Sequence, residues 1–191
     1  MREYPEQSSR LTSGAESSEA AFMPNSVVPL VIAATLALPL APAQQPPVPS
    51  VDPPSGERLL LRLEAEGVQI YSCAFDNGAP AWKFQGPEAK LTSANGSPAG
   101  SHFAGPSWKL LDGSEVKGSP VASKPAPEPD AVPWLLLKVA SETGDGKLRG
   151  TDYITRTNTK GGVAPPSGCD PSHQGAQARI PYSASYSFYG K

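Results

Sequence analysis

The sequence has little charge, and the charge that it has is balanced. Only 18% of its 191 residues are Asp, Glu, Lys or Arg, and the formal net charge is −2. Four acids and two bases precede Met23, which leaves 14 residues of each sign in the rest of the chain. Proteins that bind nucleic acid carry a basic patch or stripe, and segments that bind anionic membranes carry clusters of Lys and Arg. Because neither feature is present, the sequence argues against both kinds of partner.

The chain also lacks an apolar run of the length that a membrane-spanning helix needs, about 20 residues. The run at 27–40 (VVPLVIAATLALPL) is shorter and suits the apolar core of a signal peptide. Ala41-Pro42-Ala43 after it supplies the small residues of a signal-peptidase site. A buried core helix is the alternative, which Pro29 and Pro39 oppose. We therefore predict a signal peptide at 23–43, and a secreted or periplasmic protein with no stable membrane anchor after cleavage.

The segments on either side of this signal peptide are not predicted to fold. Residues 1–22 are acidic and Ser-rich, whereas a signal peptide begins with positive charge. We interpret Met23 as the translation start and residues 1–22 as a non-native or disordered extension. Residues 44–56 are Pro-rich and predict an extended tether. Residues 57–191 have the length of a single domain.

Cysteine is scarce as well, since Cys73 and Cys169 are the only two. An even number of cysteines in an exported chain favours a disulfide. Two free buried thiols, or one catalytic thiol, are the alternatives. We predict the bridge Cys73–Cys169.

Proline and glycine are abundant, with 23 and 18 residues, and they separate short apolar segments. In the last segment, Tyr182, Ala184, Tyr186 and Phe188 alternate with serines, as in a strand with one buried face. Other segments of strand length are 58–63, 67–73, 82–84, 90–92, 107–111, 134–140 and 151–157. We predict an all-β fold, a single-domain β-sandwich or barrel with long Gly/Pro-rich loops and one disulfide. Glu64-Ala65-Glu66 leaves a helix open after the first segment, and a parallel α/β fold lacks the amphipathic helices that it needs.

A set of motifs in this order resembles the domain of unknown function 3455 family. The motifs are 67–73 (GVQIYSC), 86–89 (GPEA), 102–108 (HFAGPSW), 112–114 (DGS), 132–137 (VPWLLL), 158–162 (NTKGG) and the Tyr182–Tyr189 tail. The resemblance covers the chain from about Leu60 to its end. It implies an exported bacterial or fungal protein with one shared domain, and it implies no activity. Some relatives are called malate dehydrogenase-like, but the chain has no glycine fingerprint between a strand and a helix.

Histidine is rare, and His102 is the first candidate for chemistry because it lies in an aromatic neighbourhood. It suits a general base or a metal ligand, or else a hydrogen-bonded turn histidine packed on an aromatic ring. Asp112, with Ser114 or Ser107 as the nucleophile, would complete a hydrolytic set with it. Against that set, Asp112-Gly113 is a turn signal and no Gly-x-Ser-x-Gly motif occurs. We predict no metal site and no cofactor.

Three further residues are candidates for binding. Trp82 and Trp108 suit a face that stacks on carbohydrate or contacts a protein, or else they belong to the core. Arg156, with Gly161-Gly162 nearby, suits an anion site, or else it pairs with an acid. The first functional hypothesis is therefore a secreted or periplasmic binding or interaction module, with carbohydrate or another protein as its partner. The alternative is a secreted hydrolase that uses His102 and Asp112.

Overall fold

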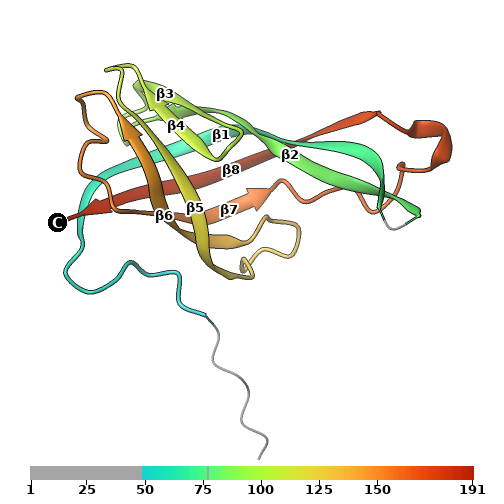
Figure 1. The fold of residues 1–191 in the computed structure, drawn as a ribbon, viewed down its shortest axis with the longest axis horizontal. Coiled ribbons are helices and arrows are strands. Elements are labelled where there is room, and N and C mark those ends of the chain that lie inside the picture. The colour runs from blue at the N-terminus through green and yellow to red at the C-terminus, as the bar shows by residue number, and fades with distance from the viewer. Residues whose placement is uncertain (1–48, 77) are drawn as a thin grey trace, which may run out of the picture. The chain divides into compact units, whose positions relative to one another are not determined.

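The computed structural model describes residues 49–76 and 78–191, which form eight strands and one turn of 3-10 helix (Figure 1). The strands are β1 (Arg58–Asp76), β2 (Ala79–Thr92), β3 (Pro98–Phe103), β4 (Ser107–Leu110), β5 (Glu115–Lys124), β6 (Trp134–Thr143), β7 (Tyr153–Gly161) and β8 (Gln177–Gly190), with the 3-10 turn η1 (Pro171–His173) before β8. The predicted extension (1–22) and signal peptide (23–43) lie outside the described residues. Within those residues, no helix is long and apolar enough to cross a membrane.

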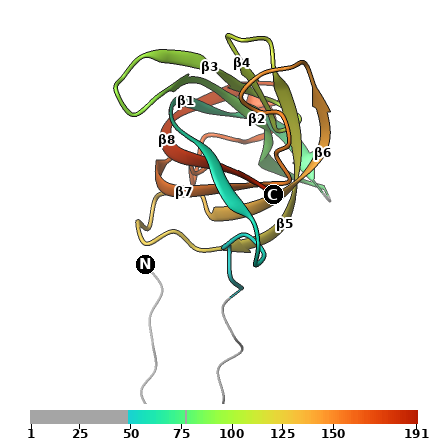
Figure 2. The ribbon, with the colours of Figure 1, turned by 90° about the vertical axis from the view of Figure 1, so that its left-hand side faces the viewer.

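Each strand pairs antiparallel with the next one in sequence, and β8 returns to pair with β1 (Figure 2). The sheet therefore closes into a barrel. The all-β prediction is confirmed, and of the two predicted architectures the barrel is the one observed. The first four connections, from β1 to β5, are short turns, and the connections from β5 to β8 are longer loops. Gly96 and Gly113 occupy two of these turns with φ of 81° and 89°, a conformation that glycine adopts without a steric cost.

Strand β1 is longer than the sequence pattern predicted. The segments predicted at 58–63 and 67–73 belong to one strand of 19 residues. Glu64-Ala65-Glu66 lies inside that strand, so the helical alternative is wrong. Gly67 allows the strand to continue at close range to β2, because a Cβ atom there would lie 2.1 Å from the carbonyl oxygen of Glu88.

Large side chains fill the inside of the barrel. As predicted for the last strand, Tyr182, Ala184, Tyr186 and Phe188 lie on one face, and each is at most 4% exposed. They pack against apolar side chains from the other strands and the β6–β7 connection, namely Leu63, Leu91, Trp108, Leu110, Val116, Leu137, Leu148 and Ile154. An eight-stranded barrel has an interior just wide enough for side chains to fill. Here these side chains form the core, and two cavities lie on the outer face and at one end of the barrel.

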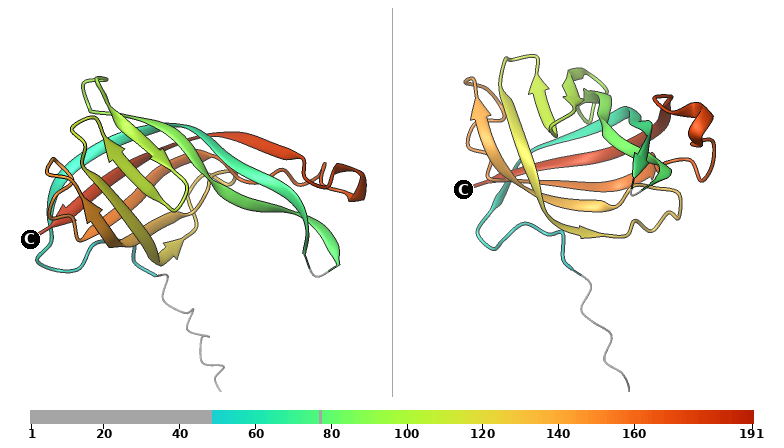
Figure 3. Two further views of the ribbon diagram at one scale, coloured as in Figure 1. Left: turned by 45° about the horizontal axis from the view of Figure 1, so that its top comes forward. Right: turned by 45° about the vertical axis from the view of Figure 1, so that its right-hand side comes forward.

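The β1–β2 hairpin continues past the barrel as an arm (Figure 1, Figure 3). We define the arm as residues 71–76 and 78–84 together with the loop 162–176. The predicted disulfide is confirmed, since Cys73 and Cys169 are bonded and join β1 to this loop. Two backbone hydrogen bonds also join β1 to this loop: Cys73 N donates to Ala176 O and Gly175 N donates to Cys73 O, each at 2.8 Å.

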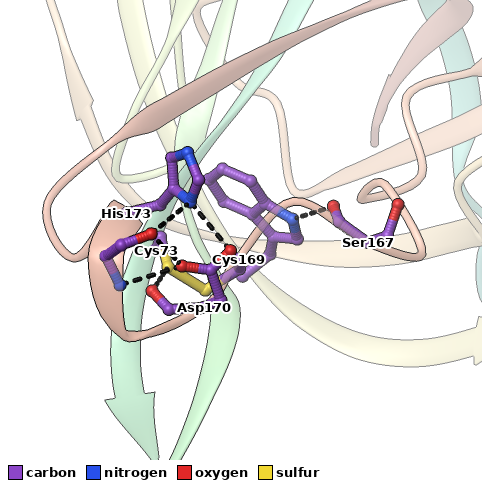
Figure 4. Close-up of polar contacts among 7 residues, drawn as sticks. Cys73, Ser167, Cys169, Asp170 and His173 are labelled. Atoms are coloured by element: carbon purple, nitrogen blue, oxygen red, sulfur yellow. Dashed lines mark hydrogen bonds and ion pairs between the residues drawn. A yellow bond between two sulfur atoms is a disulfide. The ribbon is translucent and has the colours of Figure 1, made fainter.

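Polar contacts complete the end of the arm (Figure 4). Trp82 Nε1 donates to Ser167 O at 2.9 Å, next to the disulfide. Asp170 caps η1 by accepting from Ser172 N and Ser172 Oγ, and its second oxygen lies 2.8 Å from His173 Nδ1. The Ser172 hydroxyl, followed by His173, lowers the pKa of Asp170 to about 2. The loop is thus held to the hairpin by a covalent bond and by a local hydrogen-bond network.

Candidate functional site

A groove of about 1080 Å³ runs over the outer face of five adjacent strands, β7, β8, β1, β2 and β3. We call it the outer groove. One residue from each strand contributes to a paired row across it: Lys160, Ser183, Glu66, Lys90 and Ser101. Neighbouring strands lie about 4.8 Å apart, so the row extends over roughly 19 Å. The outer groove is therefore long enough to hold an extended ligand.

A bulge in β7 shapes one side of the outer groove. Thr157 pairs with Ser185, and Lys160 pairs with Ser183. Two residues of β7 therefore lie between these pairs, opposite one residue of β8, which is the pattern of a β-bulge. One of them, Asn158, has a φ of 51°, which is uncommon for a residue other than glycine. Its Nδ2 donates to Ser185 Oγ at 3.2 Å. A residue in such a conformation persists where its surroundings hold it, and this hydrogen bond is one such restraint.

Ser185 also connects Asn158 to β1 through a second hydrogen bond. Its hydroxyl donates to Glu64 Oε2 at 2.7 Å, while it accepts from Asn158. Ser185 is only 4% exposed, whereas both of its partners are exposed. The chain Asn158–Ser185–Glu64 therefore joins three strands at the floor of the outer groove and fixes polar groups at its surface.

The charges along the outer groove balance. Three acids and three bases line it: Glu64, Glu66, Glu88, Lys90, Lys160 and Arg179. Arg179 Nη2 pairs with Glu88 Oε2 at 2.8 Å. Within the described part of the chain, Glu66, Lys90 and Lys160 have no ion-pair partner within 4.0 Å. These three exposed side chains are available to a ligand.

His102, the first candidate for chemistry, belongs to the core. It is 2% exposed, its ring stacks on Trp108 with centroids 4.4 Å apart, and it lies 4.8 Å from the ring of Tyr186. Its Nδ1 lies 2.8 Å from Ser107 O, and because a carbonyl only accepts, the proton of the neutral ring is on Nδ1. Burial lowers the pKa of His102 to about 4 against the opposing effect of this hydrogen bond, and Arg156 lowers it further. These contacts match a hydrogen-bonded histidine packed on an aromatic ring, in a strand instead of a turn.

Asp112 and Ser114 lie together at the β4–β5 turn and share no contact with His102. Asp112 Oδ1 accepts from Ser114 N at 3.0 Å and from Ser114 Oγ at 2.6 Å, and Oδ2 accepts from Lys147 N at 2.9 Å. The Ser114 hydroxyl, then the two backbone amides, lower the pKa of Asp112. Ser114 is fully buried, and its Oγ accepts from Leu148 N at 3.3 Å. The carboxylate and the hydroxyl therefore join two connections of the barrel, and no contact unites them with His102.

Of the three candidates for binding, Trp82 lies apart from the other two, whereas Arg156 and Trp108 both lie beside Tyr186. Trp108 is 1% exposed and belongs to the core. Trp82 is half-buried on the arm, where it donates to Ser167 O. Arg156 is half-buried, and its Nε and Nη2 donate to Pro133 O at 3.1 and 2.7 Å, so it binds a carbonyl instead of the acid suggested by the sequence. The structure does not bring these three residues into one site.

Residues 49–76 and 78–191 contain no group of three or more His, Cys, Asp or Glu side chains that could hold a metal ion.

With this geometry described, the chain can be compared with known proteins. The family described as "Protein of unknown function (DUF3455)" matches residues 54–190. The chain belongs to the DUF3455 family. The match begins just before β1 and ends at the last residue of β8, so DUF3455 corresponds to the complete barrel with its arm. No curated protein and no solved structure matches the chain.

The outer groove of this DUF3455 member was not predicted from its sequence. The only local signal was the face of β8 opposite to its core residues, where Ser183 and Ser185 alternate with them. The pairing that places Glu66 and Lys90 beside these serines joins residues far apart in sequence. Nothing in the residue types around Asn158 indicated a bulge. Short-range patterns could therefore identify the serine face but not its neighbours.

Proposed function

We propose that this DUF3455 protein is an exported binding module whose outer groove binds a neutral, hydroxyl-rich ligand, an oligosaccharide. The observation that carries the proposal is the row Lys160–Ser183–Glu66–Lys90–Ser101. It presents hydroxyls, which donate and accept, between ammonium donors and a carboxylate acceptor. Sugar hydroxyls need both kinds of partner, and the three acids and three bases that line the groove sum to no net charge.

The closed sheet also supports recognition by side chains. Peptides that bind sheet proteins often add a strand to an open edge. Closure of a barrel removes such edges, and β8 pairs with β1 here along most of its length. The outer groove lies on the face of paired strands, so a ligand meets side chains instead of free backbone groups. This arrangement favours a ligand with many hydroxyls over an extended peptide.

Export is supported by the disulfide, because such bonds persist in oxidising compartments and are rare in the cytosol. The signal peptide at 23–43 remains a prediction. The alternative of a secreted hydrolase gains no support from the contacts, since His102 stacks inside the barrel while Asp112 and Ser114 bind each other and nearby amides.

The proposal is tested by incubating the purified protein with an array of neutral and charged oligosaccharides. We expect binding to neutral members, and little change between about 50 and 500 mM salt because a neutral ligand is not screened. The double variant Glu66→Ala/Lys90→Ala removes one acceptor and one donor from the row without changing the net charge. It should weaken binding at least about tenfold, since hydrogen bonds to charged groups contribute about 1.5–3 kcal/mol.

The matched control is Glu128→Ala/Lys138→Ala, which also removes one acid and one base from exposed positions outside the outer groove. It should bind as the unaltered protein does. Failure of every neutral saccharide to bind, or equal binding by the two double variants, would overturn the proposal. Selective capture of a protein or of a charged polymer by the same face would also contradict it.

A further inference from the structure

A second cavity, of about 770 Å³, lies at the end of the barrel opposite the arm. We call it the end pocket. It is formed where the start of β1 meets the β2–β3 turn, the β4–β5 turn and the β6–β7 connection. It shares no lining residue with the outer groove.

The floor of the end pocket is apolar. Leu63 and Leu110 belong to the core at its base, and Leu61 and Ala99 are partly buried against the same core. Leu111 stands at the rim with 76% of its surface exposed, the largest fraction among the exposed large hydrophobic residues of the described chain. Water contacts this leucine unless something covers it, so an apolar ligand group in the pocket is favoured by the hydrophobic effect.

Hydrogen bonds hold the polar walls in place. Asn95 Oδ1 accepts from Ser93 Oγ at 2.6 Å and from Ser97 N at 3.1 Å, which fixes the β2–β3 turn. Asp112 fixes the opposite wall through its contacts with Ser114 and Lys147 N. The end pocket is thus preformed, with an apolar floor and a few oriented polar groups, which is the usual composition of a small-molecule site.

The two charged residues of the end pocket, Asp112 and Lys147, differ in their hydrogen-bond and ion-pair partners. Each oxygen of Asp112 already accepts hydrogen bonds from the protein. Lys147 interacts electrostatically with Asp112. Its ammonium group makes no ion pair within 4.0 Å among the described residues. The charged group that remains open to a ligand is therefore a cation at the edge of an apolar floor.

We propose that the end pocket binds a small amphipathic carboxylate, with its alkyl chain on the leucine floor and its carboxylate at Lys147. The apolar floor selects the chain, and the ammonium selects the head group as a point charge with three donors. This site is independent of the outer groove, so either proposal stands if the other fails.

The test is calorimetric titration of the protein with decanoate below its micelle concentration, and with decanol as the uncharged analogue. We expect decanoate to bind the unaltered protein. Lys147→Gln should weaken decanoate about tenfold or more and leave decanol nearly unchanged, because only the carboxylate pairs with the lysine. Leu111→Ser should weaken both ligands, because the alkyl chains of both pass the apolar side chain of Leu111 at the rim of the pocket.

Two control variants lie outside the end pocket: Lys138→Gln carries the same change as Lys147→Gln, and Val121→Ser replaces another apolar side chain, 56% exposed, by serine. Both should bind decanoate as the unaltered protein does. All four substituted side chains are exposed, so folding is expected to be retained, and circular dichroism confirms it. Absence of decanoate binding, or an equal loss in the pocket and control variants, would overturn the proposal. So would an equal effect of Lys147→Gln on the two ligands.

Discussion

Replacing both Cys73 and Cys169 with serine is expected to lower the free energy of unfolding by about 3 to 5 kcal/mol. The two residues are 96 positions apart, so the bond closes a long loop and removes much conformational freedom from the unfolded chain. Urea unfolding of the oxidised protein and of the double variant measures the difference. The reductant is the control, because it should destabilise the unaltered protein and leave the double variant unchanged.

Without the disulfide, local unfolding should begin in the arm. Apart from the disulfide, the loop 162–176 is held to the hairpin by few contacts, among them the two backbone bonds of Cys73 and the hydrogen bond from Trp82. Regions with few buried contacts open first. Hydrogen exchange should therefore rise in residues 162–176 before it rises in β5 to β7. Equal stability of the oxidised and reduced protein would contradict this account of the arm.

Lowering the pH from about 6.5 to about 4 is expected to remove roughly 3 kcal/mol of stability through His102 alone. The folded protein holds the pKa of His102 at about 4, below its ordinary 6.5, because the ring is buried. Between these values the unfolded chain binds a proton that the folded chain excludes. The contribution of His102 is thus complete above pH 6.5, falls as the pH decreases, and is lost below about 4.

The difference in stability between the unaltered protein and His102→Gln, measured by urea unfolding at several pH values, isolates this effect. The difference should change with pH between about 4 and 6.5 and stay constant above that range. His173→Gln is the matched control, because it removes the exposed histidine of η1. A pH-independent difference for His102→Gln would show that the ring is not buried in the neutral form.

Local patterns predicted those parts of the fold that depend on neighbouring residues. The alternation from Tyr182 to Phe188 identified the core face of β8, and the cysteine count sufficed for the disulfide. Closure of the barrel could not be predicted in the same way, because it depends on the pairing of β1 with β8 across most of the domain. The alternation of Glu64 and Glu66 with Ala65 and Gly67 was a strand signal, but short acidic stretches also suit helices.

The candidate sites were less accessible to the sequence than the fold was. His102 was noted for its aromatic surroundings and Trp108 as a candidate for a binding face, and their stacking places both in the core. The outer groove and the end pocket consist of residues from several strands and turns whose register no short motif encodes. Lys147 and Leu111 carry no signal of their own. Only the barrel places them beside the same apolar floor.

Binding of a neutral saccharide to the outer face of β7, β8, β1, β2 and β3 can be mapped by amide chemical shifts. The isotope-labelled protein is titrated with a neutral oligosaccharide that it binds on the array. We expect the largest shifts on Glu66, Lys90 and Ser183 and their neighbours in the outer groove. Shifts centred on the arm around Trp82, or on His102 inside the barrel, would contradict this expectation.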